Sequence, residues 1–200
     1  MSTATHAHIS EEDADLLFRK ARTFYAWKPE PVSDDTLRDI YNLFKFGPTS
    51  FNTSPARILF LRTAEAKARL LPGLMPVNVE KVRTSPVTAI IAYDTEFYEK
   101  LPKLVPHMDA RSFFAGNAPL IHDTAFRNGS LQGAYLIIAA RANGLDCGPM
   151  SGFDASKVNA EFFPDGKWKA NFLCNLGHGD ATNQFPRAPR LDFEEACQLL

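Results

Sequence analysis

The chain has 200 residues, of which 45% are hydrophobic and 22% charged, and its formal net charge is -1. Such a composition is ordinary for a soluble globular domain, and the near-zero charge argues against a nucleic-acid-binding protein, which would be strongly basic. The longest apolar run, residues 134–140, is too short to span a bilayer, and the N-terminus lacks the features of a signal peptide. We therefore expect a cytoplasmic protein, with a flexible tail at residues 1–9 and a single domain at residues 10–200.

Two helices are expected in the first quarter of the chain. Ser10 is expected to cap the first, and the apolar positions Leu16, Leu17, Ala21 and Phe24 recur at helical spacing as its buried stripe. Ser33 is expected to cap the second, which covers residues 34–46 and ends at Gly47-Pro48. Its apolar face is expected to consist of Leu37, Ile40, Tyr41, Leu43 and Phe44.

A polar segment separates this second helix from the first predicted strand, residues 57–62. It contains five small polar side chains: Thr49, Ser50, Asn52, Thr53 and Ser54. Turn formation explains one or two of them, and the polar edge of a ligand would explain the others.

The middle of the chain alternates between regular and irregular segments. Thr63 is expected to cap a helix over residues 64–71, whereas residues 72–86 predict a loop with at most a short helix. The almost wholly apolar run at residues 87–93 predicts a central strand that is buried on both faces. Residues 94–127 look less regular, and their aromatic residues fit either a lid or a local core, with a slight preference for a lid.

Residues 128–154 combine a predicted buried helix with a predicted glycine-rich loop. Ser130 is a plausible cap for a helix that is apolar on nearly all sides through residue 140, and Asn143-Gly144 is its expected end. A glycine-rich loop is expected to follow, because Gly148 and Gly152 would let a flat ligand approach the backbone closely. An ordinary turn between a helix and a strand remains an equally good interpretation.

The C-terminal quarter completes the predicted elements. It contains a short helix at residues 155–163, a buried strand at residues 171–177 and an extended segment at residues 186–191. Asp192 then caps a last helix, with Glu195 placed for a capping box. The order of these elements predicts an α+β sandwich with helices on both faces of the sheet.

Several common catalytic and metal-binding motifs are absent. The cysteines at 147, 174 and 197 have no CxxC spacing, so we expect them to be reduced, semi-buried and without a metal, and we expect His107 and His122 to be structural. The serine of residues 148–152 stands one position too late for a nucleophile elbow. A hydrolase built on Cys147 or Ser151 is therefore the least favoured interpretation.

The remaining candidates are scattered along the chain. They are basic residues near 19–22, the polar segment 49–54, the glycine-rich segment 148–152 and two arginines within 187–190. Taken one by one, the basic residues near 19–22 fit compensation of a helix dipole. Together, these groups suit a planar phosphorylated cofactor, because arginines clamp phosphate and small polar groups edge a ring.

The sequence also resembles the nitroreductase-like flavin enzymes over nearly its whole length. The ordered elements are ART at residues 21–23, GPTSFN at 47–52, GLDCGPMSGFD at 144–154 and RAPR at 187–190. The runs GPTS-x-N-x-SPARI, SPVTAI, EFYE-x-LP, GPMSGFD and LxFEEA are most similar to the malonic semialdehyde reductase branch, which is associated with pyrimidine catabolism.

This resemblance implies a three-layer α/β/α sandwich with a central, mostly antiparallel sheet, in an intertwined homodimer with FMN at the subunit interface. It implies that hydride passes from NADPH or NADH to flavin N5 and then to a small substrate such as malonic semialdehyde, with no catalytic side-chain acid or base. Arg22 and Arg190 would bind the phosphate, with Arg187 helping one of them, and Thr23 belongs to the same N-terminal motif of the cofactor site. Thr49, Ser50 and Asn52 would lie at the ribityl chain and ring edge. Pro149 and Met150 would back the ring, with a backbone N–H of Ser151 or Gly152 at N5.

Two other functions remain open at this point. A general nitro- or quinone-reductase would have the same fold, and a flavin-binding protein without turnover would have the same cofactor site. The sequence does not distinguish NADH from NADPH, because no acidic residue of a dinucleotide-binding fingerprint is present.

Overall fold

An antiparallel sheet of four strands, in the order β1-β2-β4-β3, forms the middle layer of the fold. The computed structural model describes residues 8–182 and 184–200, so most of the expected flexible tail lies outside the described residues. The strands are β1 (Ala56–Leu61), β2 (Val87–Asp94), β3 (Asp146–Met150) and β4 (Trp168–Gly177).

Strand β2 lies in the interior of the sheet, as its sequence predicts. All eight of its residues are buried. Ile91 belongs to the apolar cluster on one face of the sheet and Ile90 to the cluster on the other. This two-sided burial is why the strand is almost continuously apolar.

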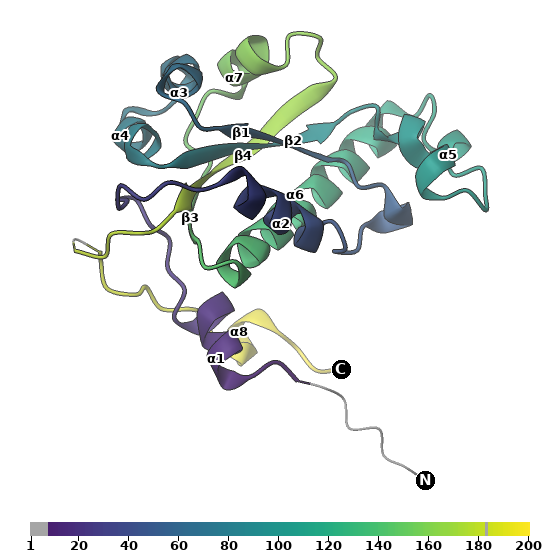
Figure 1. Cartoon of the computed structure of the whole chain (residues 1–200). Coiled ribbons are helices and arrows are strands. Elements are labelled where there is room, and N and C mark those ends of the chain that lie inside the picture. Colours follow the sequence, from purple (N-terminus) through teal and green to yellow (C-terminus); the bar gives the residue numbers. More distant parts are fainter. Residues whose placement is uncertain (1–7, 183) are drawn as a thin grey trace.

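Helices cover both faces of the sheet, which confirms the expected three-layer sandwich (Figure 1). One face carries α2 (Asp34–Phe44) and α6 (Ala118–Ala142), and the other carries α3 (Ala64–Leu70), α4 (Pro76–Thr84) and α7 (Ala155–Phe162). Ser33 and Thr63 are the caps of α2 and α3, as predicted. On α2, Leu37, Ile40 and Phe44 are buried, whereas Tyr41 and Leu43 are exposed.

Residues 97–114 form a small lobe beside the sheet. It contains α5 (Leu101–Leu104) and 3-10 turns at Phe97–Lys100 and Arg111–Phe113. Phe114 belongs to a third apolar cluster, but Phe113 is 56% exposed and lies 5.8 Å from the ring of Phe51. The aromatics of this segment therefore divide between a local core and an exposed surface beside the polar segment.

Helix α6 is longer than the sequence indicates. It begins at Ala118, where Asn117 accepts a hydrogen bond from the backbone of Leu120, so the predicted cap at Ser130 is wrong. The prediction failed because Gly129 and Gly133 weaken the helical signal just where the helix lies closest to the sheet. A Cβ at Gly133 would come within 2.4 Å of the ring of Phe172.

The predicted glycine-rich loop begins as a strand. Residues 146–150 form β3, which pairs with β4 along one edge. Its other edge receives a hydrogen bond from the backbone N–H of Phe24 to the carbonyl of Cys147, at 3.0 Å. A Cβ at Gly148 would lie 2.4 Å from the carbonyl oxygen of Phe24, so glycine permits this close approach.

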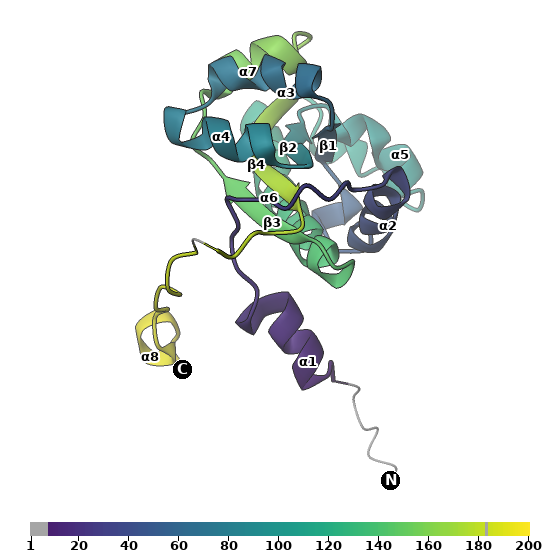
Figure 2. The ribbon, with the colours of Figure 1, turned by 60° about the vertical axis from the view of Figure 1, so that its left-hand side comes forward.

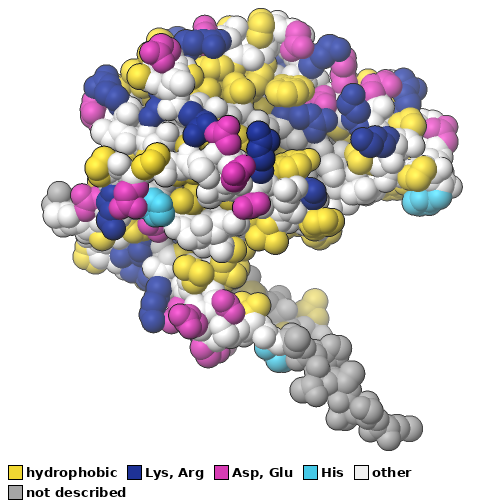
Figure 3. Space-filling model, in the orientation of Figure 1, with side chains coloured by type: hydrophobic (Ala, Val, Ile, Leu, Met, Phe, Trp, Pro, Cys, Tyr) yellow, Lys and Arg dark blue, Asp and Glu magenta, His cyan; other side chains and the backbone are white. Residues whose placement is uncertain are grey.

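Two short helices stand outside the three layers (Figures 1 and 2). Helix α1 (Glu11–Ala14) is capped by Ser10 as predicted and continues as a π-helical turn at Asp15–Arg19, and α8 (Phe193–Ala196) has the predicted capping box. The predicted buried stripe of this first helix is wrong, because Leu16 is 49% exposed and Ala21 and Phe24 lie beyond the helical residues. Hydrophobic side chains are visible where these arms leave the body (Figure 3).

Among the described residues, no helix combines the length and the apolar character that a membrane crossing requires.

Candidate functional site

Residues 21–23 near the N-terminus and residues 184–187 near the C-terminus contact each other beside β3. The guanidinium of Arg22 donates to the carbonyl of Phe185 at 2.5 Å, and that of Arg187 donates to the carbonyl of Ala21 at 2.6 Å. The side chain of Gln184 adds a hydrogen bond to the carbonyl of Thr23 at 3.0 Å. These reciprocal contacts bring the two predicted basic segments together, although most of the chain separates them.

A cavity of about 620 Å³ lies between these segments. Its lining residues include Arg22, Thr23, Arg187 and Arg190, and also Arg19 and Arg141. Arg141 comes from the last turn of α6 and was not predicted, because nothing in its local sequence connects it with the other arginines.

The charge of this cavity is strongly one-sided. Arg19 pairs with Glu11 and Asp15, and hydrogen bonds from Lys20 and Arg19 lower the pKa of the Asp15 carboxyl. No acidic residue in the described part of the chain forms an ion pair with any of the other four arginines, Arg22, Arg141, Arg187 and Arg190. Like charges gathered in this way repel one another, so the cavity is suited to a multiply charged anion such as a phosphate group.

Strand β3 connects this cavity, through Thr23, with the segment that follows the strand. Thr23 forms a bridge with Cys147, and Met150 lies about 10 Å further along the extended strand. The carbonyl of Gly152 accepts hydrogen bonds from the backbone of Met75 at 3.0 Å and from Asn78 Nδ2 at 2.9 Å. These two bonds fix the peptide that follows Pro149 and Met150.

The backbone donors at this point are free. Within residues 8–182 and 184–200, the N–H groups of Ser151 and Gly152 donate no hydrogen bond to another protein group. Ser151 is exposed and Gly152 half-buried, so a ligand can reach both. A Cβ at Gly152 would lie 2.6 Å from Asn78 Nδ2, which explains the glycine.

Asn78 and Lys81 are site residues that the sequence did not reveal. Lys81 Nζ donates to Asn78 Oδ1 at 3.0 Å and lies 5.8 Å from the centre of the Tyr25 ring, at the edge of the arginine cavity. Both residues belong to α4, in a segment predicted mainly as a loop. Residues three positions apart lie side by side only on a helix, so the sequence alone does not show that Asn78 and Lys81 are neighbours.

The polar segment 49–54 has a specific and unusual backbone. Phe51, Asn52 and Ser54 have φ values of 51°, 49° and 41°, in the left-handed region that residues with side chains rarely adopt. The backbone N–H of Ser50 donates to Asn128 Oδ1 at 2.8 Å, and the hydroxyl of Thr49 accepts from the backbone of Ser54 at 3.1 Å. Strained backbone of this kind is concentrated at functional sites.

This polar segment does not join the arginine cavity within one chain. Asn128, which holds Ser50, and Arg141, which lines the cavity, are about 20 Å apart along α6 at 1.5 Å per residue. One chain therefore carries two separate groups of predicted residues, toward opposite ends of the same helix.

The cysteines and Ser151 do not form a nucleophilic site among the described residues. Cys147 and Cys174 are fully buried, and a hydrogen bond with Cys147 together with burial raises the pKa of the Cys174 thiol. Cys197 is exposed, so the expectation that all three cysteines are semi-buried is wrong. The side chain of Ser151 has no hydrogen bond to a described histidine or carboxylate, and no described cluster of side chains has the composition of a metal site.

Comparisons with known proteins agree on one family. The sequence model of the Nitroreductase family matches residues 18–178. A relative from Polynucleobacter asymbioticus, provisionally named "NADH dehydrogenase/NAD(P)H nitroreductase", is 60% identical over 192 residues, which are 96% of this chain and 98% of the relative. A relative from Rhodopseudomonas palustris with the same name is 59% identical over 96% of this chain and 98% of its own length.

Solved structures show the same fold at low sequence identity. A nitroreductase-type protein from Bacillus subtilis superposes with a TM-score of 0.84 at 18% identity, over 96% of this chain and all of the other. A second, from Exiguobacterium sibiricum and solved in complex with FMN, has a TM-score of 0.83 at 19% identity, over 98% of this chain and all of the other. From the match over residues 18–178 and the 60% identical relative, the chain belongs to the nitroreductase family.

Proposed function

We propose that this protein is an FMN-dependent NAD(P)H oxidoreductase that reduces malonic semialdehyde to 3-hydroxypropionate in pyrimidine catabolism. The observation that carries the cofactor assignment is the cavity lined by four arginines without carboxylate partners, from which β3 leads to the two free backbone N–H groups of Ser151 and Gly152. The names of the relatives support NAD(P)H as the reductant, and the FMN complex of a structural neighbour supports the flavin.

Residues of the arginine cavity and of the segment after β3 would contact such a cofactor at two points, its phosphate and its ring. Arg22 and Arg190, with Arg187 and Arg141 nearby, would hold the phosphate, and Thr23 would hydrogen-bond beside it. Pro149 and Met150 would lie against the ring, and the N–H of Ser151 or Gly152 would donate to the ring atom that exchanges hydride. When bound, FMN would supply two-electron hydride chemistry, for which these residues provide orientation and no proton transfer of their own.

We further propose that the site is completed by a second copy of the chain. A homodimer in which the two α6 helices pack in opposite directions would bring the polar segment of one copy to the arginine cavity of the other. Thr49, Ser50 and Asn52 would then meet the ribityl chain and ring edge. The exposed side chains of Leu120, Phe126 and Leu131 on α6 provide an apolar surface for this packing.

The choice of malonic semialdehyde depends on the sequence runs shared with that branch of the family. A general nitro- or quinone-reductase is the second candidate, and it is favoured by the names of the relatives. The two functions use the same cofactor site and differ in the electrophile that is reduced.

Steady-state kinetics of the purified protein separate these functions. We expect kcat/KM for malonic semialdehyde with NADPH or NADH to exceed that for nitroaromatics and quinones by at least about tenfold. The reverse order would assign the protein as a general nitroreductase. A protein that binds no FMN, or whose FMN is not bleached by either nucleotide under anaerobic conditions, would refute the oxidoreductase assignment.

A further inference from the structure

The polar segment 49–54 has a conformation that its own residues do not favour. Phe51, Asn52 and Ser54 are all in the left-handed region, and none of them is a glycine. The hydroxyl of Thr53 is buried and has no hydrogen-bond partner among the described residues. Hydrogen bonds within the segment, such as that from the backbone of Ser54 to the Thr49 hydroxyl, are therefore joined by contacts from outside that help to hold this shape.

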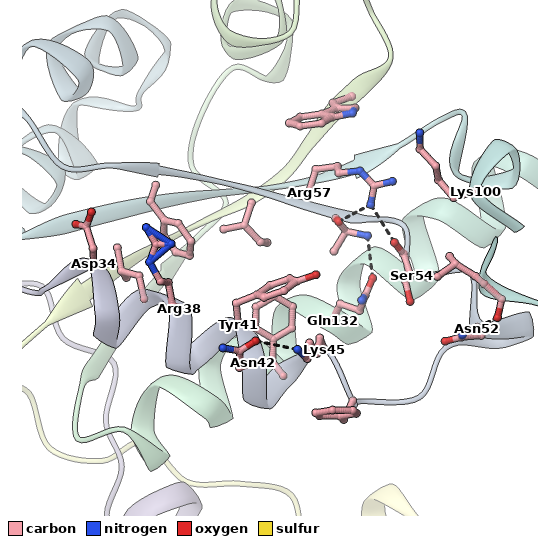
Figure 4. A pocket seen from close by; sticks show the side chains of 18 of the residues that line it. Asp34, Arg38, Tyr41, Asn42, Lys45, Asn52, Ser54, Arg57, Lys100 and Gln132 are labelled. Carbon is pink, nitrogen blue, oxygen red and sulfur yellow. Dashed lines mark hydrogen bonds between the residues drawn. The ribbon is translucent and has the colours of Figure 1, made fainter.

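Arg57 provides the charged contact at the C-terminal end of the segment. Its Nη1 donates to the carbonyls of Ser54 and Ala56, at 3.0 Å and 2.8 Å, and its Nη2 donates to Asp94 Oδ2 at 2.6 Å. Figure 4 shows the guanidinium between β1 and the segment. A planar guanidinium reaches all three acceptors with donors on two separate nitrogens in a fixed fork, whereas the three donors of an ammonium group lie on one nitrogen.

Asp94 is held in place by hydrogen bonds other than the one that it accepts from Arg57. It is the last residue of β2, its backbone N–H donates to the carbonyl of Pro55 at 2.9 Å, and its Oδ1 accepts from the backbone of Glu96 at 2.8 Å. The side chains of Arg57 and Asp94 are 21% and 8% exposed, so solvent screens this ion pair only weakly. The sheet thus presents Arg57 to the segment in one orientation.

The N-terminal end of the segment is held by neutral groups. Tyr135 donates from its hydroxyl to the carbonyl of Pro48 at 3.0 Å, and Asn128 accepts from the backbone of Ser50. Both residues lie on α6, whereas Arg57 lies on β1. The segment is therefore held at both ends, and Asn52 Nδ2 also donates to the carbonyl of Leu104 at 3.0 Å. Among the described residues that contact the segment, only Arg57 provides charge-assisted hydrogen bonds.

We propose that Arg57, oriented by Asp94, is a positioning residue of the flavin site. It holds the segment 49–54 in the left-handed conformation in which Ser50 and Asn52 can hydrogen-bond the ring edge of FMN. This inference rests on the proposed flavin function. It predicts that Arg57 affects the absorption spectrum and the reduction potential of the bound flavin. Hydrogen bonds to the ring edge alter the flavin spectrum and reduction potential, whereas general stability of the fold does not.

Arg57→Met tests this role, with Arg62→Met as the matched control. Arg62 follows the last residue of the same strand, but it contacts Asp34 and the carbonyl of Val32 rather than the polar segment. We expect Arg57→Met to bind FMN about tenfold more weakly, as for the loss of one charge-assisted hydrogen bond, and to show a shifted flavin absorption band and midpoint potential. Arg62→Met should match the wild type in all three measurements.

A second substitution separates positioning from stability. Ser54→Gly removes the backbone strain at φ 41°, so in the Arg57→Met background it should restore part of the FMN affinity and return the flavin band toward its wild-type position. Asp94→Asn combined with Arg57→Met should weaken binding no more than the worse of the two single changes, because both break the same contact. If Arg57→Met does not fold, Arg57→Lys keeps the charge without the fork and should show the same spectral shift.

The outcomes distinguish this inference from the function on which it rests. If the wild type binds FMN and NADPH or NADH bleaches it, but Arg57→Met and Arg57→Lys keep wild-type affinity, spectrum and potential, the positioning role is refuted and the function stands. If the wild-type protein binds no FMN, both are refuted. Weaker binding with a shifted potential, partly reversed by Ser54→Gly, supports the positioning role.

Discussion

At the residue scale, Arg190 is the most direct probe of the arginine cavity. Its guanidinium contacts only the carbonyls of Ala188 and Pro189 among the described residues, so it is available for an anion. Removing one charge-assisted contact to phosphate should cost about 1.5–3 kcal/mol, which is about a 10- to 100-fold weaker affinity for FMN. We expect this loss for Arg190→Ala in a fluorescence titration.

Arg69→Ala is the matched control for this experiment. Arg69 pairs with Glu161 across α3 and α7, away from the cavity, so its removal should leave FMN affinity unchanged. Equal affinities for the wild type, Arg190→Ala and Arg69→Ala would contradict the placement of the phosphate.

The sequence predicted some of the site residues because local chemistry marks them. Paired arginines near prolines, small polar side chains after a helix, and closely spaced glycines all differ from ordinary surface composition. Arg141 and Asn78 carry no such mark, because each has a neighbourhood typical of a helix. Only the packing of α6 and α4 brings them to the cavity and to Gly152.

At the element scale, the lobe at residues 97–114 has a pH-sensitive contact. Two hydrogen bonds from Arg111, at 2.8 Å and 2.6 Å, lower the pKa of Glu99 below its ordinary value of 4.5. A carboxyl whose folded-state pKa is lowered contributes stability that is fully present above the unfolded-state value and is lost as the pH falls through the folded-state value. This exposed ion pair should therefore add a small stabilisation to the lobe at neutral pH, which is lost only below pH 4.5.

Hydrogen exchange of the amides in residues 97–114 measures this effect. After correction for intrinsic rates, protection should fall as the pH drops below 4.5 in the wild type. Glu99→Gln should already have the lower protection at pH 7 and lose no more on acidification. If the two proteins have the same protection at pH 7, the contact does not hold the lobe.

The elements that the sequence predicted well are those with two independent signals. Strand β2 has a continuous apolar run bounded by turn residues, and α2 and α3 each have a cap followed by helical periodicity. The beginning of α6 and the strand β3 were missed for one physical reason. Glycines at 129, 133 and 148 weaken the local pattern, but a Cβ at these positions would lie only 3.0, 2.4 and 2.4 Å from atoms of another part of the chain.

At the scale of the whole molecule, the exposed face of α6 should form the contact between two copies. Leu131 is 42% exposed on this face, next to Phe126 and Ala134. A charge there would be buried without a partner on dimer formation, so Leu131→Asp should shift the protein toward the monomer. Ala160→Asp, at an exposed position of α7 on the opposite side of the sheet, is the control.

Light scattering coupled to size-exclusion chromatography gives the mass directly. We expect a dimer for the wild type and for Ala160→Asp, and a larger monomer fraction for Leu131→Asp. A dimer of unchanged stability in Leu131→Asp would exclude this face of α6 as the interface.

The quaternary arrangement is the part that local sequence patterns could not provide. Three features become visible only in the folded chain. They are the exposed Leu16 after α1, the separation of the polar segment from the arginine cavity, and the apolar face of α6. In the sequence, the dimer was an implication of the family resemblance, and no residue pattern indicated it.

The most direct test of a site shared between two copies is complementation between two defective variants. Arg22→Ala/Arg190→Ala removes phosphate contacts, and Ser50→Ala/Asn52→Ala removes the polar groups of the other half-site. If the two groups act across the interface, co-expressed mixed dimers contain one intact site, and they should bind one FMN per dimer with wild-type affinity although neither parent does. Mixed dimers that bind FMN no better than the parents would contradict the shared site.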